Sequence, residues 1–353
     1  MNVAANPGAT LVGVIHPIDT AALASYLREH VAPFAGTLTA EEFQGGQSNP
    51  TYRITAGDCR YVLRRKPPGQ LLPSAHAVDR EFRVMSALAG TDVPVPKMYA
   101  LCEDASVIGT AFYVMEYIEG RVLWDPALPG MTRAERTAHY DELNRVIAAL
   151  HGVDVGLAGL ADFGKPGNYV ERQVARWSRQ YQAAAGERIE SMDRLIEWLP
   201  RHVPASDEVA IVHGDYRLDN VIFHRSEPRI LAVLDWELST LGHPLSDFAY
   251  QVMAWRLTPV QFRGLKGFDL ETLGIPSEQE YIAMYCRRTG RASMPDWEIY
   301  LIFNMFRIAA ILHGVLARAL QGNAASANAV EQGSRARLVA DTAWEMAQAI
   351  DAS

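Results

Sequence analysis

Three side chains in the second half of the sequence have the types and the spacing that phosphoryl transfer requires. Asp215 precedes Asn220 by five positions, and Asp235 follows Asn220 by fifteen. Each lies at the end of a short apolar run that favours a β-strand. A carboxylate can orient an attacking hydroxyl, while an amide and a second carboxylate can hold Mg²⁺ on the phosphates of a nucleotide. The alternative is a hairpin loop rich in Asp and Asn only because both residues favour turns.

The motifs around these three residues resemble those of kinases. His213-Gly214-Asp215 stands where protein kinases have His-Arg-Asp, and Asp235-Trp236-Glu237 stands where they have Asp-Phe-Gly. Both departures from the protein-kinase pattern resemble the aminoglycoside phosphotransferase family, the small-molecule branch of the kinase-like fold. The resemblance implies Asp215 as the catalytic base and Asn220 and Asp235 as the Mg²⁺ ligands.

The resemblance also implies how ATP, or another nucleoside triphosphate, is held by the first part of the chain. Arg64 aligns with the phosphate-binding lysine of kinases, and Glu81 aligns with its acidic partner on a neighbouring helix. Arginine replaces lysine here, although a forked guanidinium also binds phosphate well. The alternatives are a solvated strand end for Arg64 to Lys66 and a surface helix position for Glu81.

Two further segments are expected to contact the nucleotide. A glycine-containing turn would direct backbone N–H groups at the phosphates, because glycine lets the main chain approach closely. This turn consists of Gly45, Gly46, Gln47 and Ser48. At the hinge Glu116-Tyr117-Ile118, backbone groups would meet the adenine edge, and Met115 would line the pocket. Plain hairpin chemistry explains the glycine pair nearly as well, and a methionine on a buried strand is more often core.

Apolar periodicity divides the chain into two parts. The first contains a helix capped by Asp19 and ending near His30, strands at 51–55, 61–64 and 112–115, and a helix that begins at Ser74 and carries Glu81. Helices are then expected at 132–151, 171–184, 189–202, 247–255, 279–288, 297–319 and 327–349. This order resembles the α+β, bilobal protein-kinase-like fold. Its small β-rich N-lobe would be 1–115, its hinge 116–120, and its larger, mainly helical C-lobe 121–353, with the catalytic loop and an acceptor cleft.

Composition excludes several other classes of protein. The chain has 353 residues, of which 49% are hydrophobic and 21% charged, as in ordinary globular proteins. A net charge of −8 without a basic block argues against a nucleic-acid partner. No run of eighteen apolar residues occurs and the first residues do not resemble a signal peptide, so no membrane association is expected. Cys59, Cys102 and Cys286 lie far apart and are read as reduced thiols of a cytoplasmic protein. Oligomeric state is not determined by the sequence.

The acceptor is expected to be a small molecule with an alcohol group. Leu234 to Asp247 and the later run 306–314 resemble the phosphotransferase-like domains associated with acyl-CoA dehydrogenases. That resemblance implies a hydroxylated acyl compound, such as a hydroxyacyl-CoA or a related hydroxy acid. A late group of arginines suits an anionic acceptor and would repel a cationic aminoglycoside: Arg287, Arg288, Arg291, Arg307 and Arg318.

Each of these late features has a plainer alternative. One or more of Arg288, Arg307 and Arg318 are expected near the mouth of the cleft, but these arginines can equally form salt bridges on helix faces. The apolar side chains beside them would line the path of an acyl tail or belong to the core, as helical spacing predicts more often. They are Phe303, Phe306, Ile311 and Leu312.

Supporting roles follow for four other residues. Asp247 is expected to brace the catalytic loop, with Asp247 or Ser246 capping a helix. His213 is expected to support that loop through a buried hydrogen bond, and His151 and His313 to be structural.

Four classes of function are therefore compared. A small-molecule kinase, that is, a phosphotransferase with an alcohol group as acceptor, agrees best with the motifs. A non-catalytic kinase-like nucleotide-binding module is disfavoured by the intact Asp215, Asn220 and Asp235. A kinase of aminoglycosides or other antibiotics is disfavoured by the arginines. A protein kinase is disfavoured because no Ala-Pro-Glu closes an activation segment.

Overall fold

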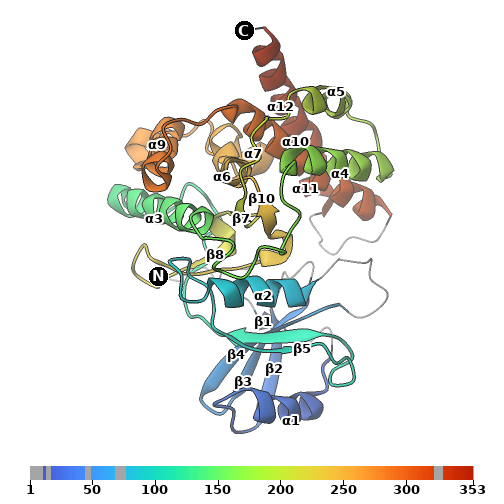
Figure 1. Ribbon diagram of the computed structural model, residues 1–353, viewed down its shortest axis with the longest axis vertical. Coiled ribbons are helices and arrows are strands. Elements are labelled where there is room, and N and C mark those ends of the chain that lie inside the picture. The colour runs from blue at the N-terminus through green and yellow to red at the C-terminus, as the bar shows by residue number, and fades with distance from the viewer. Residues whose placement is uncertain (1–10, 13–16, 44–48, 68–76, 322–328, 353) are drawn as a thin grey trace. The chain divides into compact units, whose positions relative to one another are not determined.

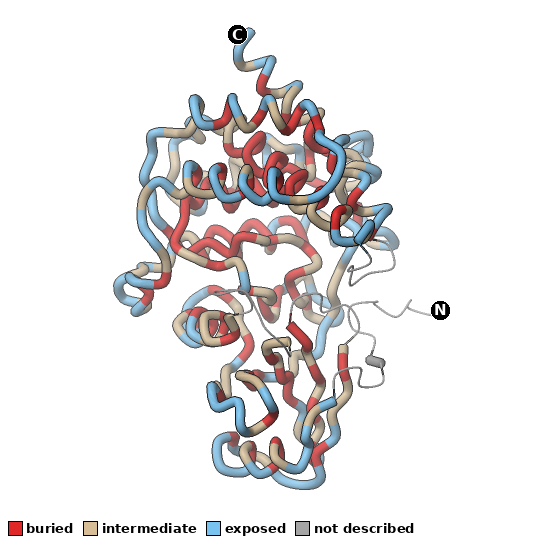
Figure 2. The backbone as a smooth tube through the Cα atoms, turned by 90° about the vertical axis from the view of Figure 1, so that its right-hand side faces the viewer, coloured by how far each residue is buried: buried red, intermediate tan, exposed pale blue. Residues whose placement is uncertain are grey.

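The computed structural model describes residues 11–12, 17–43, 49–67, 77–321 and 329–352. The chain forms two compact units, each built from segments that are distant in sequence. The first consists of Met1–Trp124, Gly156–Ala161 and Leu218–Ser239, and the second of Asp125–Val155, Asp162–Arg217 and Thr240–Ser353. Figure 2 shows that each unit has its own buried core.

A six-stranded antiparallel sheet forms the first unit (Figure 1), in the order β1-β2-β3-β4-β6-β5. The strands are β1 (Leu11–Val12), β2 (Leu38–Phe43), β3 (Thr51–Ala56), β4 (Cys59–Arg65), β5 (Met98–Cys102) and β6 (Phe112–Glu116). The strands predicted at 51–55, 61–64 and 112–115 are confirmed. β5 is absent from the sequence-based expectation, because Pro94 and Pro96 just before it indicate a break in regular structure.

Two helices pack on this sheet. Helix α1 (Thr20–His30) begins where predicted, because the Asp19 carboxylate accepts hydrogen bonds from the backbone N–H groups of Ala21 and Ala22 at 3.0 and 2.9 Å. Helix α2 (Val78–Leu88) corrects the prediction of a start at Ser74. Ser74 lies outside the described residues, and the helix begins after Ala77, whose side chain makes no capping bond.

Strand alternation in β4 decides which side chains meet each helix. Tyr61 and Leu63 belong to the apolar cluster that contains Leu23 and Leu27 of α1. Arg64 belongs to the opposite face of the strand, where α2 lies.

A short hairpin completes the first unit. It consists of β8 (Val221–Phe223) and β9 (Ile230–Val233), with the 3₁₀ turn η3 (Leu218–Asn220) just before β8 and η4 (Trp236–Leu238) shortly after β9. The chain beyond β6 pairs with it, since the backbone N–H of Arg121 donates to Phe223 O at 2.7 Å and the N–H of Phe223 donates to Arg121 O at 2.8 Å. A side chain on Gly120 would meet Ile222 Cγ2 and Phe223 O at 2.3 Å, so only glycine allows this approach.

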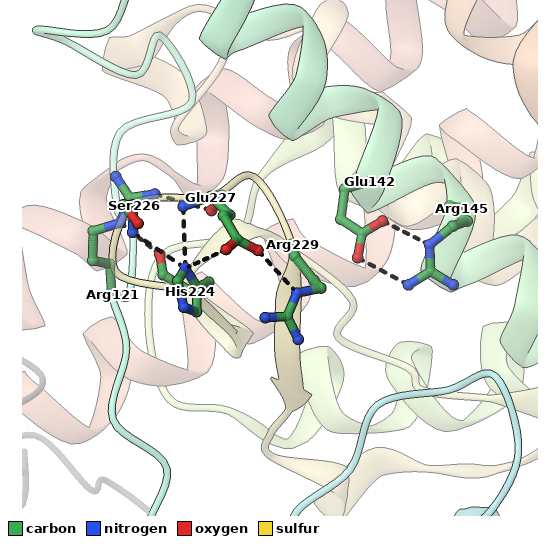
Figure 3. Close-up of polar contacts among 7 residues, drawn as sticks. All are labelled: Arg121, Glu142, Arg145, His224, Ser226, Glu227 and Arg229. Atoms are coloured by element: carbon green, nitrogen blue, oxygen red, sulfur yellow. Dashed lines mark hydrogen bonds and ion pairs between the residues drawn. The ribbon is translucent and has the colours of Figure 1, made fainter.

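Polar contacts connect the residues at the tip of this hairpin (Figure 3). The Arg121 guanidinium donates to the carbonyl oxygens of His224 and Glu227 at 2.9 and 3.3 Å. The backbone N–H groups of Ser226 and Glu227 donate to His224 Nδ1 at 3.4 and 3.2 Å. Arg229 Nε donates to the Glu227 carboxylate at 3.2 Å. The separate pair Glu142–Arg145 in Figure 3 is an i, i+3 contact within a helix of the second unit.

The second unit is mainly helical. Its helices are α3 (Arg133–His151), α4 (Tyr169–Ala183), α5 (Glu190–Trp198), η2 (Leu199–Arg201), α6 (Pro244–Val252), η5 (Met253–Trp255), α7 (Pro259–Phe262), α8 (Leu270–Leu273), α9 (Glu278–Thr289), α10 (Trp297–Leu320), α11 (Ala329–Ser334) and α12 (Ala336–Asp351). Strands β7 (Ala210–Val212) and β10 (Thr240–Gly242) pair antiparallel. Helix α3 agrees with the expectation because Thr132 forms a capping box with Glu135.

Two helix boundaries in this unit correct the prediction. Helix α6 begins at Pro244 rather than at Asp247, and its cap is His243, whose Nδ1 accepts the Leu245 N–H at 3.2 Å. The single helix expected at 327–349 is two helices, α11 and α12. α11 packs closely on α10, because a side chain on Gly333 would meet the backbone of Leu316 at 2.7 Å.

Helix α10 is long and apolar enough to cross a membrane by length and composition alone. In this fold 72% of its most apolar window is buried, and it packs against α4, α6 and α12. It therefore resembles the central helix of a folded core. No other helix among the described residues meets the same test.

Candidate active site

The predicted pair Arg64 and Glu81 is in contact within the first unit. Arg64 Nε lies 3.1 Å from Glu81 Oε2, and the Arg64 side chain is 14% exposed. This arrangement excludes both alternatives, a solvated strand end for Arg64 and a surface position for Glu81. The next residue, Arg65, lies on the opposite face, where its guanidinium packs against the Tyr52 ring.

Two residues that sequence reasoning missed hold the Glu81 carboxylate. Asn49 Nδ2 donates to Oε1 and the Tyr113 hydroxyl donates to Oε2, each at 3.0 Å. Burial raises the pKa of Glu81, and the nearby Arg64 opposes that rise. Tyr113 was detectable in principle, because it pairs across strands with Arg64 and so faces the same side of the sheet.

Arg64 also reaches the hairpin. Its Nη2 donates to Asp235 Oδ1 at 2.7 Å and lies 3.6 Å from Glu237 Oε2. Burial alone would lower the pKa of Arg64, but Glu81 and Asp235 outweigh it and the pKa is raised. One guanidinium thus faces three carboxylates. That excess of negative charge suits a divalent cation.

The hairpin explains the fifteen-residue spacing between Asn220 and Asp235. Val221 of β8 pairs with Val233 of β9, and the Leu234 N–H donates to the carbonyl oxygen of Asn220 at 2.8 Å. The two residues therefore leave the same end of one hairpin. Asp235 has a left-handed backbone conformation, with φ of 63°, which directs the chain from β9 into η4.

The donor set on this hairpin fits Mg²⁺. Magnesium is usually bound by one or two carboxylates, with phosphate and water oxygens completing an octahedron. A carboxamide and a partly exposed carboxylate, 36% exposed at Asp235, match that pattern. Among the described residues, no three His, Cys, Asp or Glu side chains gather into an all-protein metal cage.

The hinge segment follows β6 directly. Met115 is largely buried and pairs with Val62 of β4, which lies two positions before Arg64 and on the same face of the strand. The Glu116 N–H donates to Lys97 O at 2.8 Å, so this donor is already used within the sheet. Between residues that the structure describes, the N–H of Ile118 makes no hydrogen bond. The predicted residues Gly45, Gly46, Gln47 and Ser48 lie outside the described residues.

The catalytic loop begins after β7 in the second unit and is braced as predicted. Asp247 accepts the N–H groups of His213 and Gly214 at 2.7 and 2.8 Å, and His151 Nε2 lies 3.2 Å from the same carboxylate. Burial opposes ionisation, but His151 and the His213 N–H lower the pKa of Asp247 overall. The buried ring of His213 accepts the Asp215 N–H at 3.2 Å, which confirms its supporting role.

Asp215 is held by side chains of the same unit. The Tyr250 hydroxyl donates to Asp215 Oδ1 at 2.5 Å, and Arg217 Nε lies 3.3 Å from that oxygen. Arg307 Nη2 donates to the neighbouring Gly214 carbonyl at 2.5 Å. Sequence reasoning missed Tyr250, since no local spacing connects α6 with the loop.

The late arginines have different surroundings. Arg288 binds Asp141 and Asn144 of α3, and Arg291 binds Glu208, so both form the salt bridges that the plainer alternative predicts. Arg307 is the member of the group that reaches the catalytic loop. His313 Nε2 contacts Glu187 O, as expected for a structural histidine.

Three of the four apolar residues near these arginines are core, and the fourth, Ile311, is half-buried. Phe303 and Phe306 have no exposed surface, and Leu312 is 7% exposed. These three side chains are too buried to line the path of an acyl chain, so they belong to the core, as the plainer alternative predicts.

Comparison with known proteins identifies the family of this chain. The sequence model of the phosphotransferase enzyme family matches residues 39–297, and the chain belongs to that family. Its kinase-like α+β fold, with a small antiparallel sheet and a mainly helical second part, is confirmed. A crystal structure from Ralstonia eutropha JMP134, provisionally described as an aminoglycoside phosphotransferase, is 56% identical with a TM-score of 0.87, over 94% of this chain and 99% of that one.

More distant structures share the fold alone. A thermostable mutant of the aminoglycoside phosphotransferase APH(4)-Ia, in a ternary complex with AMP-PNP and hygromycin B, has a TM-score of 0.58 at 16% identity. That comparison covers 91% of this chain and 98% of the other.

Curated relatives are longer proteins. Mouse acyl-CoA dehydrogenase family member 10 is 48% identical over 92% of this chain and 31% of its own length. Human family member 11 is 44% identical over 91% of this chain and 43% of its own length. The chain thus spans about a third to under half of the curated relatives that it matches.

Proposed function

We propose that this phosphotransferase-family protein transfers the γ-phosphoryl group of ATP to the alcohol group of a small molecule, with Mg²⁺ bound. The observation that carries the proposal is the position of Arg64. Its guanidinium contacts both Glu81 and Asp235, and Asp235 leaves the same hairpin end as Asn220. A cation, an amide and a carboxylate at one place are what triphosphate binding requires.

In this proposal the first unit binds the nucleotide. Arg64, oriented by Glu81, holds phosphate oxygens, and Asn220 and Asp235 hold Mg²⁺. Bound Mg²⁺ would neutralise charge on the β- and γ-phosphates. The Ile118 N–H meets the adenine edge beside Met115, and Glu116 orders the start of this segment. Backbone groups of Gly45, Gly46, Gln47 and Ser48 remain the proposed phosphate-facing turn.

The second unit supplies the base. Asp215 orients the acceptor hydroxyl and accepts its proton as the new oxygen–phosphorus bond forms. The bond between the γ-phosphorus and the bridging oxygen breaks, and ADP leaves with that electron pair. Tyr250 and Arg217 fix the Asp215 carboxylate, and a fixed carboxylate keeps the hydroxyl aligned with the phosphorus.

We further propose a hydroxylated acyl compound, a hydroxyacyl-CoA or a related hydroxy acid, as acceptor. Two observations support this proposal. Relatives that match over most of this chain are named acyl-CoA dehydrogenase family members. Arg307 places a cation next to the catalytic loop, which suits an anionic acceptor and disfavours a polycationic aminoglycoside.

The test is ATP turnover by the purified protein with Mg²⁺ and three kinds of acceptor: a hydroxyacyl-CoA, the matching free hydroxy acid, and kanamycin. We expect ADP and a phosphorylated product, identified by mass spectrometry, with an acyl compound only. Phosphorylation of kanamycin without activity on acyl compounds would contradict the proposed acceptor. Nucleotide binding without transfer to any acceptor in a wider panel of hydroxyl compounds would identify a non-catalytic nucleotide-binding module.

A further inference from the structure

Two arginines from different helices of the second unit contact one tryptophan ring. The guanidinium carbon of Arg176, on α4, lies 5.4 Å from the centre of the Trp177 ring. That of Arg307, on α10, lies 5.7 Å from the same centre. Helices α4 and α10 pack side by side in this unit (Figure 1), which brings the two side chains together.

This pair lies beside the catalytic loop. The Arg307 guanidinium is 5.1 Å from the centre of the Tyr250 ring, and the Tyr250 hydroxyl donates to Asp215. Arg307 also donates to the carbonyl oxygen of Gly214, the residue before Asp215. A group bound by these guanidinium ions would therefore lie next to the proposed base.

The charge of the pair is not balanced by carboxylates. Arg307 is only 5% exposed, and its Nε is buried without a hydrogen-bond partner. Within the described part of the chain, neither Arg307 nor Arg176 has a carboxylate within ion-pair distance, whereas Arg256 has two. Burial and repulsion by Arg307 lower the pKa of Arg176. Arg307 therefore carries a buried charge that no carboxylate of the described residues pairs, which is costly, and a bound anion would reduce that cost.

We propose that Arg176 and Arg307 form an anion subsite that binds a carboxylate or phosphate group of the acceptor. The identity of the anion as part of the acceptor depends on the proposed function; the subsite itself does not. Arg307 is anchored at Gly214, while Arg176 is exposed and accessible to an incoming ligand. Forked guanidinium groups bind both kinds of anion through paired N–H donors. Recognition of this kind selects anionic acceptors over neutral ones.

The direct test is titration of the full-length protein with inorganic phosphate by calorimetry. AMP-PNP and Mg²⁺ are present, so that nucleotide phosphates already occupy Arg64. We expect saturable binding that Arg176→Gln weakens by about tenfold or more, as loss of a charged hydrogen-bond donor does. Arg318→Gln is the matched control, because Arg318 is exposed on the same helix as Arg307, about three turns away.

Either of two results would overturn the subsite. One is wild-type protein that shows no saturable phosphate binding. The other is an Arg318→Gln variant that weakens binding as much as Arg176→Gln, which would indicate general attraction rather than a site. Arg307→Lys serves as a second variant, because it retains a cation near Gly214 and removes the fork.

Acceptor kinetics then identify the source of the anion. We compare 3-hydroxybutyrate, its coenzyme A thioester and 1,3-butanediol, which share a hydroxyl and differ in charge. If Arg176→Gln raises the KM about tenfold for the free acid and not for the diol, the subsite binds the carboxylate of the acceptor. If it raises the KM in the same way for the thioester, the subsite binds the phosphates of coenzyme A. An equal rise for the diol contradicts the subsite. If no acceptor is phosphorylated, the proposed function fails, and the phosphate titration still decides the subsite.

Discussion

Arg64 Nη2 donates a 2.7 Å hydrogen bond to Asp235 Oδ1, although 171 positions separate the two residues in sequence. The bond joins strand β4 of the sheet to the end of the β8–β9 hairpin. Because the same guanidinium contacts Glu81, the effects of substitutions at these three residues should not be additive.

Asp235→Asn should lower kcat by at least about 10²-fold, because the amide loses the charge that holds Mg²⁺ on the phosphates. Circular dichroism should show an unchanged fold. Glu237→Gln is the matched control, since Glu237 lies 3.6 Å from the same guanidinium and has no assigned metal role. Turnover near the wild-type rate in Asp235→Asn would remove the metal assignment.

Asp215→Ala should lower kcat by roughly 10²–10⁴-fold while the Kd of ATP changes little, because a positioned base acts on the acceptor and not on the nucleotide. Kinetics together with nucleotide titration separate the two effects. Asp219→Asn, in the same loop, serves as the control. Equal losses in turnover and in ATP affinity would instead mean that Asp215 is structural.

Arg64→Met and Glu81→Gln should each raise the KM for ATP, because phosphate binding is shared by the ground state and the transition state. The double variant should cost less than the sum of the two, since each single change already disrupts the same pair. Arg64→Lys should recover part of the affinity. Strictly additive effects on KM would show that the pair does not act as one unit.

Asp247→Asn should destabilise the protein by about 3 kcal/mol at pH 7, because a buried carboxylate that accepts two N–H groups and contacts His151 is replaced by a neutral amide. The folded-state pKa of Asp247 is lowered, so its contribution is present above the unfolded-state pKa, near 4, and is lost as pH falls through the folded-state value. Denaturant unfolding at several pH values should show the two proteins converging below about pH 4. A constant difference across that range would contradict this assignment.

Local patterns in the sequence predicted the parts of the site that one short segment determines. The spacing of Asp215, Asn220 and Asp235 follows from a loop and a single hairpin, and Asp19 marks the start of α1 by capping its first turn. Such features depend on neighbours within a few residues.

The parts that could not be predicted depend on contacts between distant segments. Asn49 and Tyr113 hold Glu81 from two different strands, and Tyr250 reaches Asp215 from α6. The close approach of Gly333 to Leu316 likewise joins α11 to α10, two helices that are separate in sequence. The spacing of residues within one segment cannot predict contacts of this kind.

The pairing of Arg121 with Phe223 joins the chain just beyond the hinge (116–120) to the hairpin, and Gly120 allows the two backbones to come this close. In the proposed assignment, the hinge groups that contact the adenine and the hairpin residues near the phosphates therefore belong to the same structural unit, and backbone hydrogen bonds connect them. The distance between the adenine-binding and the phosphate-binding segments is then fixed before the nucleotide binds. Nucleotide affinity and acceptor affinity then depend on residues of different units. Acceptor preference can therefore change among relatives while the triphosphate site stays the same.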